Sequence, residues 1–354
     1  MTRFLIMTGP YPGHFAPSMP IVRRLVECGH EVVWITGRQF KGKVETAGAR
    51  FHPLPKESDP NEMETYDFYP ELKKLKGLAQ IKYWIKHIML DACSRDIKAI
   101  DTVLTDYPAD VLIGDTVMFA PYFISEMGGP SSAQISLLPL SLASRDTAPF
   151  GLGLLPGNNL ITKSRNRLLN FLFYHVLLRD VTLYANYIRR ELRLNPLNGP
   201  FFSAMFKIPS LIMQISTPVL EYPRSDLPEN IRFIGPILPK PDPAFRTPHW
   251  WSDLNCSKPV ILVNQGTLAK NLYDLIVPTI EGLQDEQMLV VAIPVEKGHL
   301  GELPVNVRAE SFIPFNHLLP YVNVMVTNGG YGGTQFALAH GIPLVIWLAK
   351  PRIK

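Results

Sequence analysis

The stretch Val326-Thr-Asn-Gly-Gly-Tyr-Gly-Gly-Thr334 joins an apolar run to a helical pattern. Residues 323–327 indicate a short buried strand, and residues 331–340 indicate a helix. The turn that joins them is rich in glycine, at Gly329, Gly330, Gly332 and Gly333. A turn without side chains lets backbone N–H groups approach a ligand, and a helix N-terminus favours negative charge. This pattern is typical of a binding site for a diphosphate group.

Similar patterns of strand, turn and helix occur along the whole chain. In the first half, buried strands are predicted at residues 4–7, 31–36, 51–54, 110–114 and 133–137. The same alternation of strands and helices begins again in the second half, with strands predicted at residues 260–263, 288–292, 305–309 and 324–327. Because buried strands that alternate with helices form parallel sheets, we expect an α/β protein with two Rossmann-like, doubly wound domains.

A proline-rich segment separates the two halves. Residues 236–258 show little periodicity and contain Pro236, Pro239, Pro241, Pro243 and Pro248. We therefore predict an N-terminal domain at residues 1–235, a linker at 236–258 and a C-terminal domain at 259–354. Ligands of such sheets bind at the carboxyl ends of the strands, so a cleft between the domains is expected there.

Composition excludes several classes of protein. The 354 residues are 46% apolar and 19% charged, which suits a globular chain with an ample core. The net charge of +4 is modest and the basic residues are scattered, so nucleic acid is not an implied partner. Cys28, Cys93 and Cys256 lack metal-ligand spacing, which favours reduced thiols in a cytoplasmic protein. No stretch approaches the ~20 apolar residues of a spanning helix, so stable membrane insertion is not expected.

Seven motifs, in their order and spacing, resemble one family. They are Gly13-His-Phe-Ala-Pro17, Leu25-Val-Glu-Cys-Gly-His30, Ser144-Arg-Asp-Thr-Ala-Pro-Phe-Gly151, Phe233-Ile-Gly-Pro236, Asn264-Gln-Gly-Thr267, Phe312-Ile-Pro-Phe-Asn-His-Leu-Leu-Pro320 and Thr327-Asn-Gly-Gly-Tyr-Gly-Gly-Thr334. Together they resemble the GT-B glycosyltransferases of the UDP-glycosyltransferase class, close to the bacterial and fungal macrolide- or sterol-type enzymes.

The resemblance implies both an architecture and a reaction. The N-terminal domain would bind the acceptor, and the C-terminal domain would bind a nucleotide sugar. The implied reaction is an inverting transfer of a sugar from a nucleotide diphosphate, in the first place UDP, to a hydroxyl of an apolar small molecule. The nucleotide sugar is a co-substrate, so no cofactor is implied. No metal is required, because a helix N-terminus would offset the charge of the leaving group.

Two residues of the first half are candidates for proton transfer. His14 follows the first strand in a loop of Gly and Pro, where a neutral imidazole can take a proton near pH 7. From the residues alone, a loop histidine bonded to backbone fits equally well. Asp115 follows the strand 110–114, where it could orient the imidazole or cap a helix near Met118. The resemblance implies that His14 is the catalytic base and that Asp115 orients it.

The candidate donor site lies in the second half. Thr267 follows the strand 260–263, where its hydroxyl could bind a diphosphate or belong to an ordinary turn. Phe312 aligns with the family segment whose ring stacks on uracil or thymine, although an aromatic residue near proline is more often part of a core. The resemblance implies a nucleotide-sugar site made of Thr267, Phe312, Asn328, Gly329, Gly330, Gly332 and Gly333.

The sequence departs from the family pattern at three points. Many relatives have His where Asn328 stands, and Phe336 replaces an acid that often binds the ribose. The sequence also stops soon after the strand predicted at 344–347, before the acidic segment that binds the donor sugar in the family. We therefore expect an incomplete second domain and weak or absent transfer by the 354-residue chain.

Other interpretations remain open. A non-catalytic protein that binds a nucleotide or an apolar ligand is the alternative from another functional class. A dinucleotide oxidoreductase is disfavoured, because Gly9-Pro-Tyr-Pro-Gly13 does not match G-x-G-x-x-G. The amphipathic helix predicted at 168–194 favours a domain wall, with an acceptor-site lid and a membrane-surface face as its alternatives.

Overall fold

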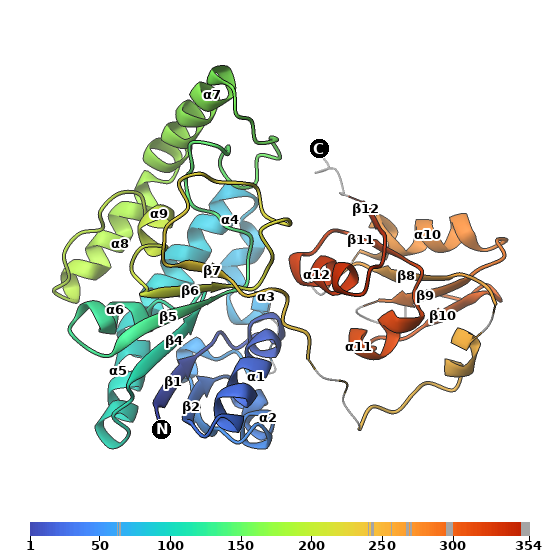
Figure 1. The fold of residues 1–354 in the computed structure, drawn as a ribbon, viewed down its shortest axis with the longest axis horizontal. Coiled ribbons are helices and arrows are strands. Elements are labelled where there is room, and N and C mark those ends of the chain that lie inside the picture. Colours follow the sequence, from blue (N-terminus) through green and yellow to red (C-terminus); the bar gives the residue numbers. More distant parts are fainter. Residues whose placement is uncertain are drawn as a thin grey trace. The chain divides into compact units, whose positions relative to one another are not determined.

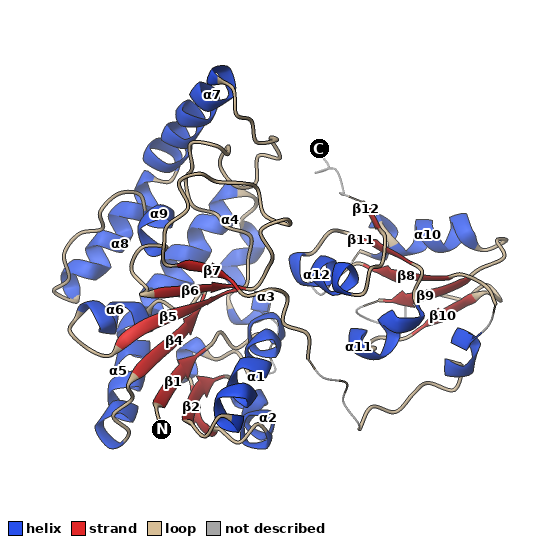
Figure 2. Cartoon of the chain, in the orientation of Figure 1, coloured by secondary structure: helices blue, strands red, loops and turns tan. Residues whose placement is uncertain are grey.

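The computed structural model describes residues 1–61, 63, 65–239, 241, 244–255, 257–266, 269, 271–294 and 300–347. The chain divides into two compact units, Met1–Ile237 and Leu238–Lys354. Each unit is built around one parallel sheet with helices against it, as Figures 1 and 2 show. The α/β fold with two parallel, doubly wound sheets that the sequence predicts is therefore confirmed.

Unit 1 contains a seven-stranded sheet in the order β3-β2-β1-β4-β5-β6-β7. All neighbouring strands are parallel. The strands are β1 (Arg3–Met7), β2 (Glu31–Thr36), β3 (Arg50–Pro53), β4 (Val111–Asp115), β5 (Ser131–Ser136), β6 (Leu211–Gln214) and β7 (Ile231–Phe233). Residues 5–7 of β1 and 32–36 of β2 are buried, as expected of a parallel sheet covered on both faces.

The helices of unit 1 bury both faces of this sheet. They are α1 (Pro12–Glu27), α2 (Lys41–Thr46), α3 (Thr65–Phe68), α4 (Leu78–Tyr83), α5 (Asp91–Asp106), α6 (Ala120–Glu126), α7 (Leu160–Asn170), α8 (Arg179–Glu191) and α9 (Phe201–Met205), with π-helices at Trp84–Leu90 and Phe171–Leu177. Short 3₁₀ turns occupy Arg38–Phe40, Lys56–Ser58 and Pro70–Lys74. Leu5 and Met7 of β1 pack with α5, α6 and α8, whereas Ile6 packs with α1 and α2. This alternation follows from the period of two in a strand.

Unit 2 contains a five-stranded parallel sheet in the order β10-β9-β8-β11-β12. Its strands are β8 (Val260–Asn264), β9 (Leu289–Ile293), β10 (Val307–Ala309), β11 (Val324–Thr327) and β12 (Leu344–Ile346). Its helices are α10 (Ile276–Leu283), α11 (Phe315–Leu318) and α12 (Tyr331–Ala339), with 3₁₀ turns at Trp251–Asn255, Leu272–Asp274 and Leu319–Tyr321. One face of the sheet packs on α10 and the other packs on α12 and Trp250.

The strand orders place the candidate residues at two equivalent points. In each sheet the order reverses direction between two central strands, β1 and β4 in unit 1 and β8 and β11 in unit 2. Ligands of open α/β sheets bind beyond the carboxyl ends of the strands at such a reversal. His14 and Asp115 follow β1 and end β4, whereas Asn328 follows β11. Each unit thus presents candidate residues at the reversal point of its own sheet.

The structure differs locally from the sequence-based prediction. His14 lies in the first turn of α1 and not in a loop, because Pro12 takes the first helical position, where a missing N–H costs nothing. The helix predicted from residue 168 already begins at Leu160, where Asn159 caps it by accepting a hydrogen bond from the Thr162 N–H. Strands β6 and β7 and helix α9 were not predicted. These elements have three to five residues each, too few to show a clear period.

Part of the proline-rich segment packs within unit 2. Trp250 and Leu254 are buried in the core of that unit, and Phe245 packs against the same cluster. The role of residues 236–258 as a linker stays a prediction. Within the described residues, no helix is both long enough and apolar enough to cross a bilayer.

Candidate active site

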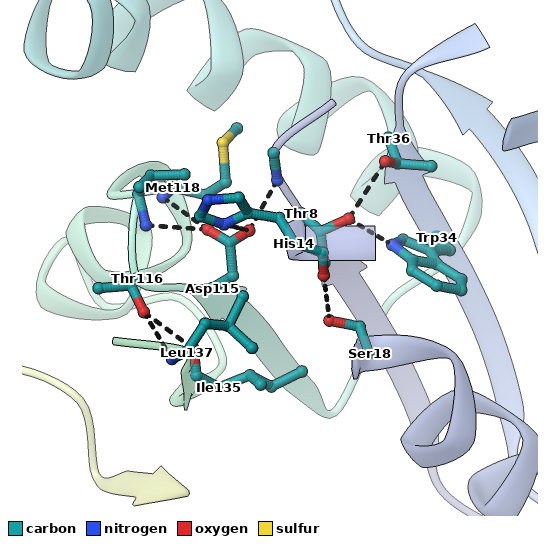
Figure 3. Close-up of polar contacts among 12 residues, drawn as sticks. Thr8, His14, Ser18, Trp34, Thr36, Asp115, Thr116, Met118, Ile135 and Leu137 are labelled. Atoms are coloured by element: carbon teal, nitrogen blue, oxygen red, sulfur yellow. Dashed lines mark hydrogen bonds and ion pairs between the residues drawn. The ribbon is translucent and has the colours of Figure 1, made fainter. Parts of the chain in front are cut away.

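The side chains of His14 and Asp115 meet at the carboxyl ends of β1 and β4 (Figure 3). Nδ1 of His14 lies 2.9 Å from Oδ2 of Asp115. The Asp115 side chain is fully buried, while 18% of the His14 side chain stays exposed. The residues are 101 positions apart in the sequence, and the parallel pairing of β1 with β4 brings them together. The imidazole therefore has a fixed buried side and an accessible side.

Asp115 accepts hydrogen bonds through both of its carboxylate oxygens. Oδ2 accepts from the Gly9 N–H at 2.8 Å as well as from His14. Oδ1 accepts from the N–H groups of Val117 and Met118, at 2.9 and 3.2 Å. The two sequence-based interpretations of Asp115 thus coexist in geometry. One oxygen faces the imidazole, and the other closes the turn before α6 in the manner of a cap.

This network fixes the tautomer of His14. A carboxylate can only accept hydrogen bonds, so at 2.9 Å Nδ1 of His14 carries the proton that it donates to Asp115. The lone pair of the neutral ring is then on Nε2. Burial by itself lowers the pKa of His14, but the charge of Asp115 and its hydrogen bond outweigh burial, so the net pKa is raised above its ordinary value. Such a ring can accept a proton and hold it.

Further side chains hold the pair in place, and the sequence patterns did not reveal them. The Tyr122 hydroxyl donates to the Asp115 carbonyl at 2.6 Å. The Ser18 hydroxyl donates to the His14 carbonyl at 2.9 Å, one helical turn along α1. Beside them, Trp34 Nε1 donates to the Thr8 hydroxyl, as Figure 3 shows. In the sequence, Ser18 could be found only from its position four residues after His14. Tyr122 could be found only from its position seven residues after Asp115.

In unit 2, the four glycines divide into a turn and a helix start. Gly329 and Gly330 form the turn after β11, and Gly332 and Gly333 lie in the first turn of α12. Gly329 has a φ of +75°, and a Cβ there would stand 3.0 Å from Ile346, so this position requires glycine. A Cβ on Gly330 or Gly332 would meet no close neighbour. The fold itself therefore does not demand glycine at these two positions.

Asn328 connects the two central loops of this sheet. Its Nδ2 donates to the Gln265 carbonyl at 2.6 Å, which joins the end of β11 to the loop after β8. Gly266 has a φ of +76° and lies against the Asn328 amide. The first turn of α12 has no acidic residue and no side-chain cap. No acidic side chain in this turn therefore offsets the partial positive charge at the N-terminus of α12.

The remaining candidate donor residues have different outcomes. Thr267 lies outside the described residues. Phe312 is 73% exposed in the loop before α11, so it is not a core residue, which removes that alternative. Three residues further on, the Phe315 ring lies 3.8 Å from where a Gly333 Cβ would stand, which connects this segment to α12. Phe336, at the position of the family acid, packs edge-to-face on Phe315.

Comparisons with known proteins identify the family of the chain. Residues 280–350 match the family described as erythromycin biosynthesis protein CIII-like, C-terminal domain. The chain is 38% identical to 4'-demethylrebeccamycin synthase of Lentzea aerocolonigenes over 97% of this chain and 82% of that protein. It is 31% identical to UDP-glycosyltransferase 2 of Phaeomoniella chlamydospora over 95% of this chain and 78% of that protein.

A solved structure gives the same fold. CalG4, the calicheamicin glycosyltransferase, aligns with a TM-score of 0.69 at 18% identity, covering 98% of this chain and 79% of the other. At 18% identity, this structural similarity shows the fold alone. The two relatives named above align over nearly the whole of this sequence at 31–38% identity. The chain therefore belongs to the GT-B glycosyltransferase family.

Proposed function

We propose that this glycosyltransferase moves a sugar, with inversion, from a UDP-sugar to a hydroxyl of an apolar small molecule. The observation that carries the proposal is the contact of His14 with Asp115 at the reversal point of the first sheet. A buried carboxylate that fixes the tautomer of a partly exposed imidazole is the arrangement that a general base needs.

The proposed reaction is a single displacement. Nε2 of His14 takes the proton of the acceptor hydroxyl while the acceptor oxygen forms a bond to the anomeric carbon. The bond from that carbon to the diphosphate oxygen breaks, and the nucleoside diphosphate leaves with the electron pair. Asp115 stabilises the imidazolium that forms. Attack from the side opposite the leaving group inverts the anomeric configuration.

Unit 2 would bind the donor. The uncapped N-terminus of α12 offers N–H groups and a positive partial charge to the diphosphate, and Gly330 and Gly332 leave room for it. We assign Gly329 and Gly333 to the same turn, Asn328 and Thr267 to its flanks, and Phe312 to the nucleobase. The UDP donor rests on the resemblance and on the name of UDP-glycosyltransferase 2. No metal is part of the proposal, because the helix N-terminus supplies the stabilising charge.

Separate observations support the acceptor class and the compartment. The name of 4'-demethylrebeccamycin synthase, which is 38% identical to this chain, supports a small molecule as the acceptor class. Among the described residues, Cys28 and Cys93 are both free thiols, which supports a reducing, cytoplasmic environment.

A transfer assay tests the proposal. The full chain would be incubated with UDP-glucose or TDP-glucose and a panel of hydroxylated aromatic and macrocyclic acceptors. Any glycoside that forms should show inversion in its anomeric proton coupling, and it should form faster with the UDP donor than with the TDP donor. Retention of configuration would contradict the displacement mechanism. Binding of UDP by calorimetry, with neither transfer nor hydrolysis for any acceptor, would instead favour a non-catalytic binding protein.

A further inference from the structure

The most unusual surface of unit 1 is the outer side of α7, the following π-helix and α8. Along these helices the exposed positions, which a surface helix normally fills with polar residues, are mostly apolar. We call this set the apolar stripe. Its members are 42–84% exposed and are Leu160, Ile161, Leu168, Phe171, Leu172, Val176, Leu177, Leu183 and Tyr187. The opposite side of the same helices is buried in the core of unit 1, at Tyr174, Leu178, Val181 and Ala185.

The apolar stripe lies in the segment of the chain that carries the excess positive charge of the protein. Residues 160–193 contain seven Lys or Arg and two Asp or Glu, whereas the whole chain has 35 and 31. The remainder of the chain therefore carries no excess positive charge. Arg167, Arg179 and Arg190 are exposed along these helices. Asp180, one of the two acids, is paired with Lys82 and Lys86.

A cavity opens beside the stripe at Phe171. Its volume is about 330 Å³, and Arg145, Arg167 and His175 contribute basic side chains to its wall. The one carboxylate in the wall, Asp226, already accepts hydrogen bonds from the Ser144 hydroxyl and the Arg145 N–H. The cavity therefore presents basic groups next to exposed apolar side chains, as an anionic amphiphile requires.

We propose that the apolar stripe and its flanking arginines dock this protein peripherally on a membrane surface that contains anionic phospholipid. Apolar side chains would enter the boundary between headgroups and acyl chains, and the arginines would contact lipid phosphates. The cavity would admit one headgroup. In Figure 1, α7 extends outward from the body of unit 1, with its N-terminal end at the tip. No described helix could span the bilayer, so the docking is confined to one leaflet.

A second copy of the chain is the competing occupant of this surface. A symmetric dimer would bring the same face together with itself, because a two-fold interface uses one patch on both subunits. Arg167 and Arg179, which have no ion pair among the described residues, would then add like charges to the interface. An anionic surface complements the same charges. Electrostatics therefore favour lipid over self-association.

Vesicle co-sedimentation tests the proposal on the full chain. We expect binding to vesicles of phosphatidylcholine with phosphatidylserine, little binding to phosphatidylcholine alone, and release by high salt. Leu160→Ser/Ile161→Ser/Leu168→Ser removes three side chains that are at least 60% exposed, so the fold should persist, as circular dichroism would check. This variant should lose at least about ten-fold in partitioning.

Matched variants separate charge from apolar contact. Arg167→Gln/Arg179→Gln should weaken binding about 25-fold, at about five-fold for each arginine. Arg23→Gln/Lys207→Gln removes the same charge elsewhere, and Val219→Ser removes an apolar side chain that is 95% exposed, so both should bind within about two-fold of wild type.

Three results would overturn the proposal. The first is absence of binding to vesicles of either composition. The second is equal loss of binding in the control variants. The third is a concentration-dependent dimer in sedimentation velocity that the triple serine variant abolishes, which would assign the apolar stripe to a second copy of the chain.

Discussion

Oδ2 of Asp115 lies 2.9 Å from Nδ1 of His14, and the same oxygen accepts the Gly9 N–H. The imidazole is therefore tied to a carboxylate that is itself fixed by the backbone following β1. Because Oδ1 of Asp115 is also fixed, by the turn at Val117 and Met118, the carboxylate cannot rotate away. This arrangement makes separate predictions for the two residues.

His14→Ala should abolish transfer without unfolding the protein. Loss of a general base lowers the rate by ~10²–10⁴-fold. UDP affinity should not change, because the residues proposed to bind UDP lie in unit 2. Steady-state kinetics with calorimetry for UDP would check both expectations. Wild-type turnover in the variant would show that another group takes the proton.

Asp115→Ala should cost stability as well as rate. The substitution leaves the N–H groups of Gly9, Val117 and Met118 without their acceptor, and an unsatisfied buried group costs about 1–3 kcal/mol. Urea unfolding monitored by fluorescence should show a loss of at least about 2 kcal/mol, whereas His14→Ala should lose less than about 1 kcal/mol. Equal stabilities of the two variants would mean that the turn does not depend on Asp115.

The pH dependence of the rate should report the pair directly. The base must be neutral, and Asp115 holds the pKa of His14 above its ordinary value, so kcat/KM should rise with pH through that raised pKa. Asp115→Asn removes the charge and leaves burial, which lowers the pKa. The acid limb of the pH–rate profile of this variant should therefore move to lower pH, although the maximal rate of the variant falls. If the acid limb of the pH–rate profile does not move in this variant, the group that titrates there is not His14.

The sequence predicts the two sheets well because their strands are buried runs with little local ambiguity. Strands β1, β2, β8 and β11 appear within one residue of their predicted bounds. The first turn of α1 was missed because Pro12, Gly13 and Pro17 resemble loop residues, and proline inside a helix is normally disruptive. The start of α7 was missed because its first residues are apolar and exposed, contrary to the usual amphipathic pattern.

The candidate site could be predicted only in part. Asp115 stood out because it ends a buried strand, yet the sequence left its two roles open. Seeing that both roles hold together needed the contacts of Asp115 with His14 and with the Gly9 N–H, 101 and 106 residues away, and no periodic pattern encodes such contacts. In the second sheet, four glycines resembled one another in the sequence. Only the backbone angles show that Gly329 is needed by the turn, whereas Gly330 and Gly332 are not.

Gly332→Ala should separate stability from nucleotide binding. A Cβ at this position meets nothing within 4 Å, and alanine favours a helix over glycine by up to about 1 kcal/mol, so unit 2 should not be destabilised. If the N-terminus of α12 holds the diphosphate, the methyl group should lower UDP affinity by about ten-fold or more. Calorimetry and thermal unfolding would measure the two effects.

Gly282→Ala is the matched control for this variant. Gly282 lies in α10, and a Cβ there also meets nothing within 4 Å. The Gly282→Ala variant should gain a similar amount of helix stability, and its affinity for UDP should be unchanged. If both variants bind UDP as wild type does, the glycines of α12 serve only the turn and the diphosphate lies elsewhere.

Phe312→Ala should weaken binding of the nucleotide through its base alone. The ring is 73% exposed, so its removal should leave the stability of unit 2 nearly unchanged. Stacking of a base on an aromatic ring contributes about 1–3 kcal/mol, so UDP affinity should fall by about five-fold or more, while affinity for inorganic pyrophosphate should stay the same. Tyr273→Ala removes a ring of the same unit that is 70% exposed and should change neither affinity. A parallel loss for UDP and pyrophosphate would place Phe312 at the phosphates or in the loop structure, and not on the base.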